Sequence, residues 1–256
     1  MPIKAMPTKS QPQPLSNAHY WIIVPAAGVG SRMGSEIPKQ YLTLGAKTII
    51  EHTLERLLGL SFVAGIVIVI SENDTHWPEL PISKHPLIYS VAGGAERAIS
   101  VLNGLHYLYE KIQPQDWVLV HDAARPCVTL ANIETLCATL SDDAVGGILA
   151  TLVSDTLKQV DAKNTILKTI DRRSLWQAQT PQLFRYQLLC DCLSQTLVRG
   201  ENITDEASAV ELCGYAPKVV EGRSDNIKIT RADDLLLAAF ILQQQEKTLQ
   251  LQETNI

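Results

Sequence analysis

The sequence predicts an α/β fold, a mostly parallel twisted sheet flanked by helices, from three features. Short apolar runs rich in β-branched residues, such as 21–24 and 63–70, are typical of parallel strands covered on both faces. Helical patterns lie between these runs. Glycine-rich turns at 26–34 and 92–94 follow two of the predicted strands. Because open α/β sheets bind ligands at the carboxyl ends of their strands, we expect a ligand site at that edge.

The composition restricts the class of protein. A chain of 256 residues can form one α/β domain with an insertion. The formal charge of 22 − 27 = −5 argues against a nucleic-acid-coating surface, and no apolar stretch reaches the ~20 residues that cross a bilayer. Five scattered cysteines predict reduced core thiols and a cytoplasmic protein. Residues 1–19 are rich in proline and polar residues, which is typical of a disordered leader.

The first half of the chain alternates strands and helices. Thr48 and Glu51 have the spacing of a capping box, and the glycine pair at 93–94 precedes a second helix. In order, the patterns predict a strand at 21–24, a helix at 48–58, strands at 63–70 and 87–91, a helix at 97–109, a strand at 116–120, a helix at 129–140 and a strand at 144–153.

The second half departs from this rhythm. Alternating residues at 155–160 and 165–170, with turn residues between them, predict a β-hairpin, which is marginal alone and needs a partner surface. The remaining patterns predict a helix from about Leu183, a helix beginning near Thr204, a short strand at 224–230, a C-terminal helix whose apolar stripe at 235–242 packs on the sheet, and a polar tail at 243–256. The main domain is thus expected at 20–242, with an arm at 154–171.

The first glycine-rich loop is the strongest candidate for a phosphate site. Its glycines allow backbone N–H groups to approach a ligand closely, and Arg32 and Lys39 add two cations. Met33 replaces the third small residue of a dinucleotide fingerprint, and Gln40 replaces the first glycine of a Walker A loop at 45–48. The alternative is a tight structural turn without a ligand.

Two further strand ends carry candidate residues. Gly93 and Gly94, with Arg97 and the Ser100 hydroxyl one turn later, form a possible anion or base site, although a plain helix start explains the glycines as well. Asp122 ends the strand at 116–120, where a carboxylate could hold Mg²⁺ together with phosphate oxygens. The alternative is that Asp122 caps a turn and pairs with Arg125.

Several motifs together carry a family resemblance. Pro25-Ala26-Ala27-Gly28 with Gly30, Arg32 and Pro38-Lys39-Gln40-Tyr41, and the run from Val118 to Pro126, are similar to the 2-C-methyl-D-erythritol 4-phosphate cytidylyltransferase family over about residues 20–242. The resemblance implies a single Rossmann-like nucleotidyltransferase domain that uses CTP, a sugar-alcohol phosphate and Mg²⁺. It also implies that the hairpin is a dimerisation arm, which crosses to a second subunit and helps to build its site.

The resemblance also implies residue roles. The catalytic set is Arg32, Lys39, Arg172 and Lys228. The nucleotide-binding set is Pro25, Ala26, Ala27, Gly28, Gly30, Lys39, Gly94, Ala95, Ser100, Asp122 and Ala123. The acceptor-binding set is Arg125, Thr156, Arg172, Thr204 and Lys228, and the metal ligands are Asp122 and Asp225.

One position departs from the family pattern, because Ala95 stands where many relatives carry an acidic residue. Two alternatives therefore stay open: a cytidylyltransferase for another alditol phosphate such as ribitol 5-phosphate, and a non-catalytic nucleotide-binding protein. The cations near the expected α-phosphate favour an enzyme over a binder.

Overall fold

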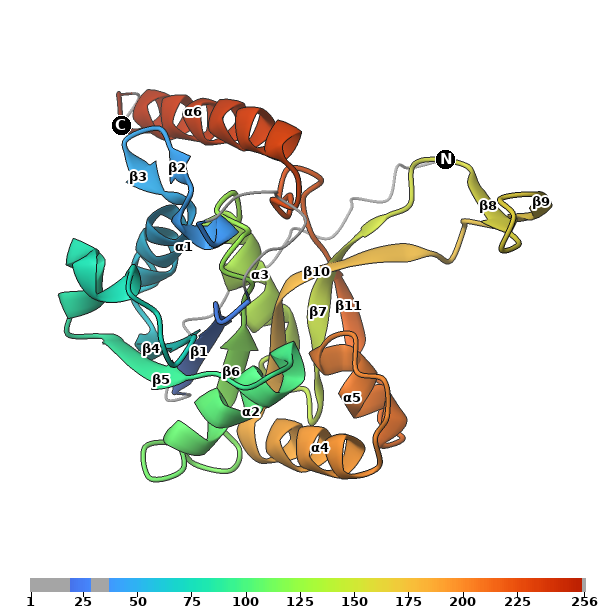
Figure 1. The fold of residues 1–256 in the computed structure, drawn as a ribbon, viewed down its shortest axis with the longest axis horizontal. Coiled ribbons are helices and arrows are strands. Elements are labelled where there is room, and N and C mark those ends of the chain that lie inside the picture. Colours follow the sequence, from blue (N-terminus) through green and yellow to red (C-terminus); the bar gives the residue numbers. More distant parts are fainter. Residues whose placement is uncertain (1–18, 29–36, 255–256) are drawn as a thin grey trace, which may run out of the picture.

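The computed structural model describes residues 19–28 and 37–254 and confirms the α/β class (Figure 1). The predicted leader lies outside the described residues, apart from residue 19. The central sheet is built from β1 (Tyr20–Pro25), β4 (Val63–Ile70), β5 (Ile88–Ala92), β6 (Trp117–Val120), β7 (Gly146–Leu152), β10 (Trp176–Arg185) and β11 (Lys218–Glu221). Its strand order is β11-β7-β10-β6-β1-β4-β5. All neighbours pair in parallel except β10, which is antiparallel to both β6 and β7.

Helices cover both faces of the sheet. The helices are α1 (Ile49–Leu58), α2 (Arg97–Tyr107), α3 (Leu130–Leu140), α4 (Tyr186–Val198), α5 (Glu206–Leu212) and α6 (Ala232–Thr254). Successive residues of a strand face opposite sides. Ile22 therefore belongs to the core beneath α1 and α3, and Ile23 to the core beneath α2, α4 and α5. The predicted capping box at Thr48 and Glu51 is confirmed at the start of α1.

Short elements complete the chain between these strands and helices. Two small strands, β2 (Thr43–Leu44) and β3 (Lys47–Thr48), pair next to α1, and the 3-10 helices are η2 (Lys39–Tyr41), η3 (Trp77–Glu79) and η4 (Pro81–Lys84). No helix in the described ranges is both long and apolar enough to span a membrane.

The helix predicted from about Leu183 is confirmed as α4, but Leu183 itself belongs to β10. Leu183 and Phe184 are fully buried between β6 and β7, and the helix begins only at Tyr186. Pro181 lies where the register of β10 with β7 shifts between Ala178 and Gln182. A proline lacks a donor, so it is tolerated where the ladder is interrupted.

The predicted strand at 224–230 is also absent from the structure. The edge strand is β11, which pairs with β7. The segment after it runs across the sheet edge without strand pairing, and Ile229 N donates to Ala124 O over 2.9 Å. This course carries Lys228 to the carboxyl end of β6.

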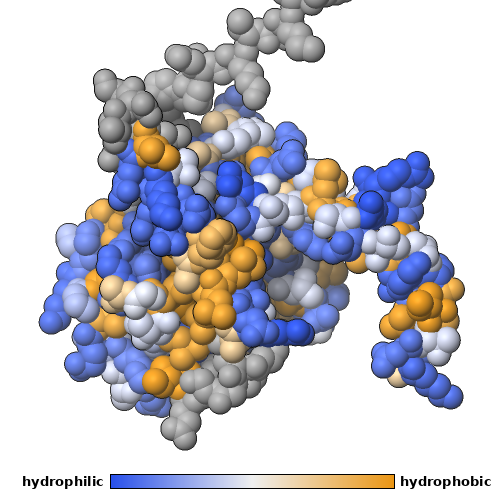
Figure 2. Space-filling model, turned by 90° about the horizontal axis from the view of Figure 1, so that it is seen from above, coloured by the Kyte–Doolittle hydropathy of each residue, from blue (hydrophilic) through white to orange (hydrophobic). Residues whose placement is uncertain are grey.

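Helix α6 differs from the prediction in both packing and length. Ala238 and Leu242 are buried beside Leu44 and Cys127 and not on the central sheet, whose faces the other helices already cover. The helix continues through the expected polar tail to Thr254. Leu236, Leu237 and Phe240 of α6 are exposed. Figure 2 looks onto this side of the molecule, where hydrophobic side chains gather.

The predicted hairpin is confirmed as β8 (Leu157–Val160) and β9 (Ile166–Ile170). It projects away from the body of the subunit (Figure 1), and all of its strand residues are exposed except Ile170, which is half-buried. Ile166 and Leu167 keep about 60% of their surface accessible. An isolated hairpin with outward apolar side chains has little stability of its own.

Candidate active site

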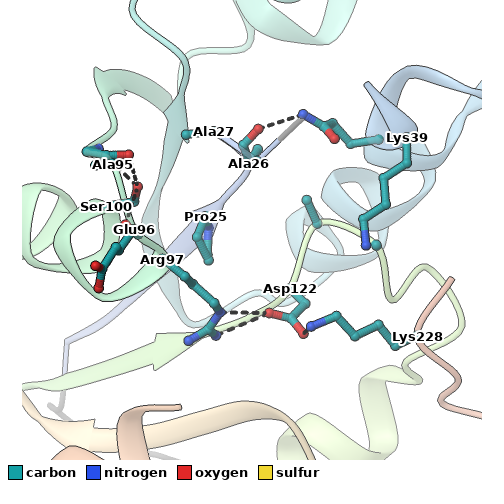
Figure 3. Close-up of a pocket in the computed structure, with 15 residues that line it drawn as sticks. Pro25, Ala26, Ala27, Lys39, Ala95, Glu96, Arg97, Ser100, Asp122 and Lys228 are labelled. Carbon is teal, nitrogen blue, oxygen red and sulfur yellow. Dashed lines mark hydrogen bonds and ion pairs between the residues drawn. The ribbon is translucent and has the colours of Figure 1, made fainter. Parts of the chain in front are cut away.

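The candidate site is a pocket at the carboxyl ends of β1, β5 and β6 (Figure 3). This is the edge at which the sequence predicted a ligand site. The pocket is lined by Pro25, Ala26, Ala27, Gly28, Lys39, Gln40, Gly94, Ala95, Glu96, Arg97, Ser100, Asp122, Ala123, Ala124 and Lys228.

The loop after β1 is held in place by buried hydrogen bonds. Ala26 N donates to Val69 O over 2.7 Å, which ties the loop to the end of β4. Gln40 is 3% exposed, and its Nε2 donates to Ala26 O over 2.6 Å. The small side chains of Ala26 and Ala27 leave the main chain accessible from the pocket. Gly30 and Arg32, which the sequence places in the same loop, lie outside the described residues.

The loop after β5 requires glycine because other groups approach its backbone closely. A Cβ on Gly93 would lie 2.5 Å from Ala27 Cβ, and one on Gly94 would lie 2.2 Å from Ile99 Cγ2. The Ser100 hydroxyl accepts from Gly94 N over 3.1 Å and donates to Glu96 O over 3.1 Å. Ser100 therefore shapes this loop from the first turn of α2.

Asp122 is the electrostatic centre of the site. It is 7% exposed and accepts from Arg97 through Oδ1, with Nη2 at 3.1 Å, and from Lys228 Nζ through Oδ2 at 2.7 Å. Arg125 Nε lies 3.6 Å from Oδ2, as the turn-pairing alternative proposed. Burial alone would raise the pKa of Asp122, but the three cations outweigh it and hold the pKa far below the usual range. Asp122 is therefore an ionised carboxylate at any working pH.

Glu206, the first residue of α5, completes this charge cluster, and the sequence did not single it out. It is 1% exposed and accepts from Arg97 Nη1 over 2.6 Å and from Arg97 Nη2 over 3.1 Å. Burial raises the pKa of Glu206, and the Arg97 guanidinium opposes that rise. Arg97 thus bridges two carboxylates, which raise the pKa of its guanidinium in spite of burial. In sequence, an acid in the first turn of a helix indicates only dipole complementarity.

A buried chain of hydrogen bonds supports Asp122 from below. Asp122 N donates to Thr180 Oγ1 over 3.0 Å, and that hydroxyl lies 3.0 Å from His121 Nδ1. His121 Nε2 lies 3.1 Å from the carbonyl of Arg125. A neutral imidazole with its proton on Nε2 satisfies all three contacts. Burial lowers the pKa of His121 to about 4, which agrees with a neutral ring.

The structure brings most of the predicted nucleotide-binding residues together and separates the others from them. Lys39 and Lys228 line the pocket with Asp122, and Lys39 Nζ donates to Ile229 O over 3.1 Å. Four of the predicted acceptor-binding residues do not line the pocket. Arg125 donates from Nη1 to Asn226 O over 2.7 Å, and Thr204 precedes the N-cap of α5. Thr156 and Arg172 lie at the base of the arm.

Asp225 is not brought to Asp122. Its carboxylate pairs with Arg223 Nη2 at 2.7 Å and lines a different cavity, beside α3 and α6. Among residues 19–28 and 37–254, no three His, Cys, Asp or Glu side chains gather into a metal cage. The expectation of a second metal-binding carboxylate at Asp225 therefore finds no support in this geometry.

Comparison with known proteins identifies relatives over most of the chain. The family model described as 2-C-methyl-D-erythritol 4-phosphate cytidylyltransferase matches residues 20–244. The enzyme of that name from Tolumonas auensis is 53% identical over 227 residues, or 89% of this chain and 98% of the relative. The Vibrio vulnificus enzyme is 51% identical over 224 residues, or 88% and 94%. The crystal structure of the Francisella tularensis enzyme aligns with a TM-score of 0.75 at 38% identity, covering 88% of this chain and all of that one.

Proposed function

The chain belongs to the 2-C-methyl-D-erythritol 4-phosphate cytidylyltransferase family, and from that premise we propose how its pocket works. The enzyme transfers CMP from CTP to 2-C-methyl-D-erythritol 4-phosphate and releases pyrophosphate, in non-mevalonate isoprenoid precursor synthesis. The observation that supports the pocket of Figure 3 as the site is the buried Asp122, with Arg97 and Lys228 converging on it from two sides.

The nucleotide lies, in this proposal, across the loops after β1 and β5. Between these loops, Ala26, Ala27, Gly94 and Ala95 present small side chains and main-chain groups to the pocket. A flat base fits between such groups, and polar main-chain atoms read its edge. Ser100 contributes to nucleotide binding by holding the loop at Gly94 in place. Its hydroxyl accepts from Gly94 N and donates to Glu96 O, which supports this role.

The transfer itself needs no covalent enzyme intermediate. An oxygen of the acceptor phosphate attacks the α-phosphorus of CTP in line, the bond to the β-phosphate oxygen breaks, and pyrophosphate leaves. Lys39 and Lys228 stabilise the charge on the reacting phosphate and the leaving group, together with Arg32 from the undescribed part of the loop. The rate enhancement comes from positioning and charge, as in other phosphoryl transfers.

We propose that a divalent cation such as Mg²⁺ accompanies CTP, with Asp122 as its protein ligand. Asp122 offers carboxylate oxygens, which are hard ligands, and a single protein carboxylate suits Mg²⁺ because phosphate oxygens and water fill its other positions. When bound, the cation supplies charge neutralisation for the triphosphate. Asp122 would hold it, and Arg97 and Lys228, which contact its two oxygens in the structure, keep that carboxylate ionised.

The acceptor is bound, in this proposal, by Lys228 with Arg125 and Thr204 of the same subunit and by Thr156 and Arg172 of a second one. The arm supports a homodimer because its apolar side chains are exposed and its two basal residues do not line the pocket of their own subunit. We place the protein in the cytoplasm, because all five of its cysteines are free thiols and four of them are buried.

An acceptor panel with CTP and Mg²⁺, followed by pyrophosphate release, tests the function. The expected result is turnover with 2-C-methyl-D-erythritol 4-phosphate and little with ribitol 5-phosphate. A preference for ribitol 5-phosphate would support the alditol phosphate alternative, and no release with any acceptor would support a non-catalytic binder. Replacing CTP by UTP in the same assay tests whether the pocket selects cytosine, and equal rates would contradict the proposed base site.

A further inference from the structure

A second cavity, with a volume of about 400 Å³, lies between the N-terminus of α3 and helix α6. It is lined by Arg56, Thr129, Leu130, Ala131, Arg223, Asp225, Phe240, Ile241, Gln244, Gln245 and Thr248. None of these residues lines the candidate active site, so the two hollows are distinct. Small-molecule sites in proteins have volumes of about 300–1,000 Å³, and this cavity falls within that range.

Part of the lining is apolar. Leu130 of α3 and Ile241 of α6 are half-buried, and Phe240 of α6 keeps 59% of its surface exposed on the side of the molecule that Figure 2 shows. A ligand with an apolar body would cover this surface and remove it from water, which favours binding.

The charged side chains of the lining carry a net positive charge, because two arginines share the cavity with one carboxylate, Asp225. Arg223 pairs with Asp225, its Nη2 lying 2.7 Å from Oδ2. Arg56 Nη2 instead donates to the neutral amide oxygen of Gln245 over 3.1 Å. Within residues 19–28 and 37–254, Arg56 forms no ion pair. Its charge is therefore available to an anion that enters the cavity.

The N-terminus of α3 adds to this positive potential. Thr129 is the N-cap of the helix, and Leu130 and Ala131, its first two residues, both line the cavity. The N–H groups of a helix's first turn have no acceptor within the helix, and they attract anions. Together with Arg56, they give a largely apolar cavity one region that suits an anionic group.

The position of Arg56 in α1 does not by itself explain where its guanidinium lies. A cation in the last turn of a helix stabilises the helix dipole, and Arg56 is such a residue. Its guanidinium is nevertheless held at the cavity by Gln245, whose Nε2 donates to Cys127 O over 2.9 Å and to Asp225 Oδ2 over 3.4 Å. Because both ends of the Gln245 amide are engaged, its oxygen stays directed toward Arg56.

We propose that this cavity is a ligand site for a small amphipathic anion. A phosphate group of the ligand binds Arg56 and the N–H groups at the start of α3, and an apolar body covers Phe240 and Ile241. Arginine and helix N-termini suit phosphate because both offer N–H donors together with positive charge. Binding at this site does not require the transfer reaction proposed for the candidate active site.

A methyl NMR titration of the full chain with n-hexyl phosphate, with n-hexanol and with inorganic phosphate tests the site. Leu130 and Ile241 report on the cavity, and Ile99, which packs against Gly94, reports on the candidate active site. Hexyl phosphate should shift the Leu130 and Ile241 methyls saturably, at concentrations at least about ten-fold lower than hexanol requires, because only the phosphate forms a charged hydrogen bond. Inorganic phosphate, which lacks the apolar body, should also require higher concentrations.

The variant Arg56→Gln removes the charge and should weaken hexyl phosphate binding about 10- to 100-fold, with hexanol binding unchanged. Arg199→Gln is the matched control. Arg199 also lies at the end of a helix and donates to a glutamine, Gln195 Oε1, over 3.1 Å, yet it lines neither the cavity nor the candidate active site. This control should bind hexyl phosphate like the parent.

Equal affinity for hexyl phosphate and hexanol, or undiminished hexyl phosphate binding in Arg56→Gln, would refute the anion site. Shifts of Ile99 without shifts of Leu130 and Ile241 would place the probe in the candidate active site and would refute it as well. The comparison of hexyl phosphate with hexanol uses the parent protein, so it decides the question even if Arg56→Gln does not fold.

Discussion

Mixing two impaired variants tests whether the arm completes the site of a second subunit. The variants are Lys39→Ala, which removes a cation that lines the pocket, and Arg172→Ala, which removes a cation at the base of the arm. Arg172 does not line the pocket of its own chain, whereas Lys39 does. If the site is built from two subunits, a mixed dimer holds one site with both lesions and one with neither.

The expected recovery follows from this geometry. A charged hydrogen bond to a phosphate contributes about 1.5–3 kcal/mol, so each variant alone should retain roughly a tenth of the parent activity or less. In an equal mixture with free exchange, half of the dimers are mixed, and half of the sites in those are intact. About a quarter of the parent activity should therefore return in a two-fold symmetric dimer.

The assay is pyrophosphate release before and after the two variants are mixed and incubated. Native mass spectrometry of variants with different tags measures how many mixed dimers have formed. Arg172→Ala should also raise the KM for the acceptor and leave the Kd for CTP nearly unchanged, because the nucleotide lies in loops of the other subunit. If mixed dimers form and activity stays at the level of the two single variants, the site is built within one chain and the arm serves only assembly.

Three further perturbations follow from the pocket and its support. Gly93→Ala places a Cβ 2.5 Å from that of Ala27, so the free energy of unfolding should fall by about 1–3 kcal/mol and CTP should bind more weakly; unchanged urea unfolding would contradict the close approach. Asp122→Asn should lower Mg²⁺-dependent kcat by roughly 100-fold or more while circular dichroism stays unchanged, and full activity at limiting Mg²⁺ would make Asp122 a structural residue. Burial lowers the pKa of His121 from its ordinary value of 6.5 to about 4 in the fold. The free energy of unfolding is therefore fully retained above pH 6.5 and falls as the pH drops toward 4, by up to ~1.4 kcal/mol per pH unit. His121→Asn should flatten this dependence in urea unfolding at pH 7.5 and 5, and an equal loss in both proteins would contradict a buried neutral imidazole.

The candidate site was predictable where its residues follow strands directly. Asp122 and the glycine pair at 93–94 come immediately after apolar runs, and parallel strands bring their carboxyl ends to one edge. Lys228 was found only through family resemblance, because the segment around it has no strand pairing and no local pattern fixes its course. The role of Asp225 as a metal ligand also came only from the resemblance and stays a prediction, and in the structure Arg223 pairs with Asp225 beside another cavity.

The sequence by itself determined the alternation of strands and helices, the glycine loops and the hairpin, because these depend on hydrophobic period and on turn chemistry within a few residues. Only the tertiary structure decided that 176–185 is a strand, because pairing with β6 on one side and β7 on the other outweighs its mixed local pattern. It alone decided that Glu206 and Arg97, separated by 109 positions, share an ion pair beneath Asp122. Burial and charge pairing depend on which segments meet in space, and that information is not contained in any short stretch of chain.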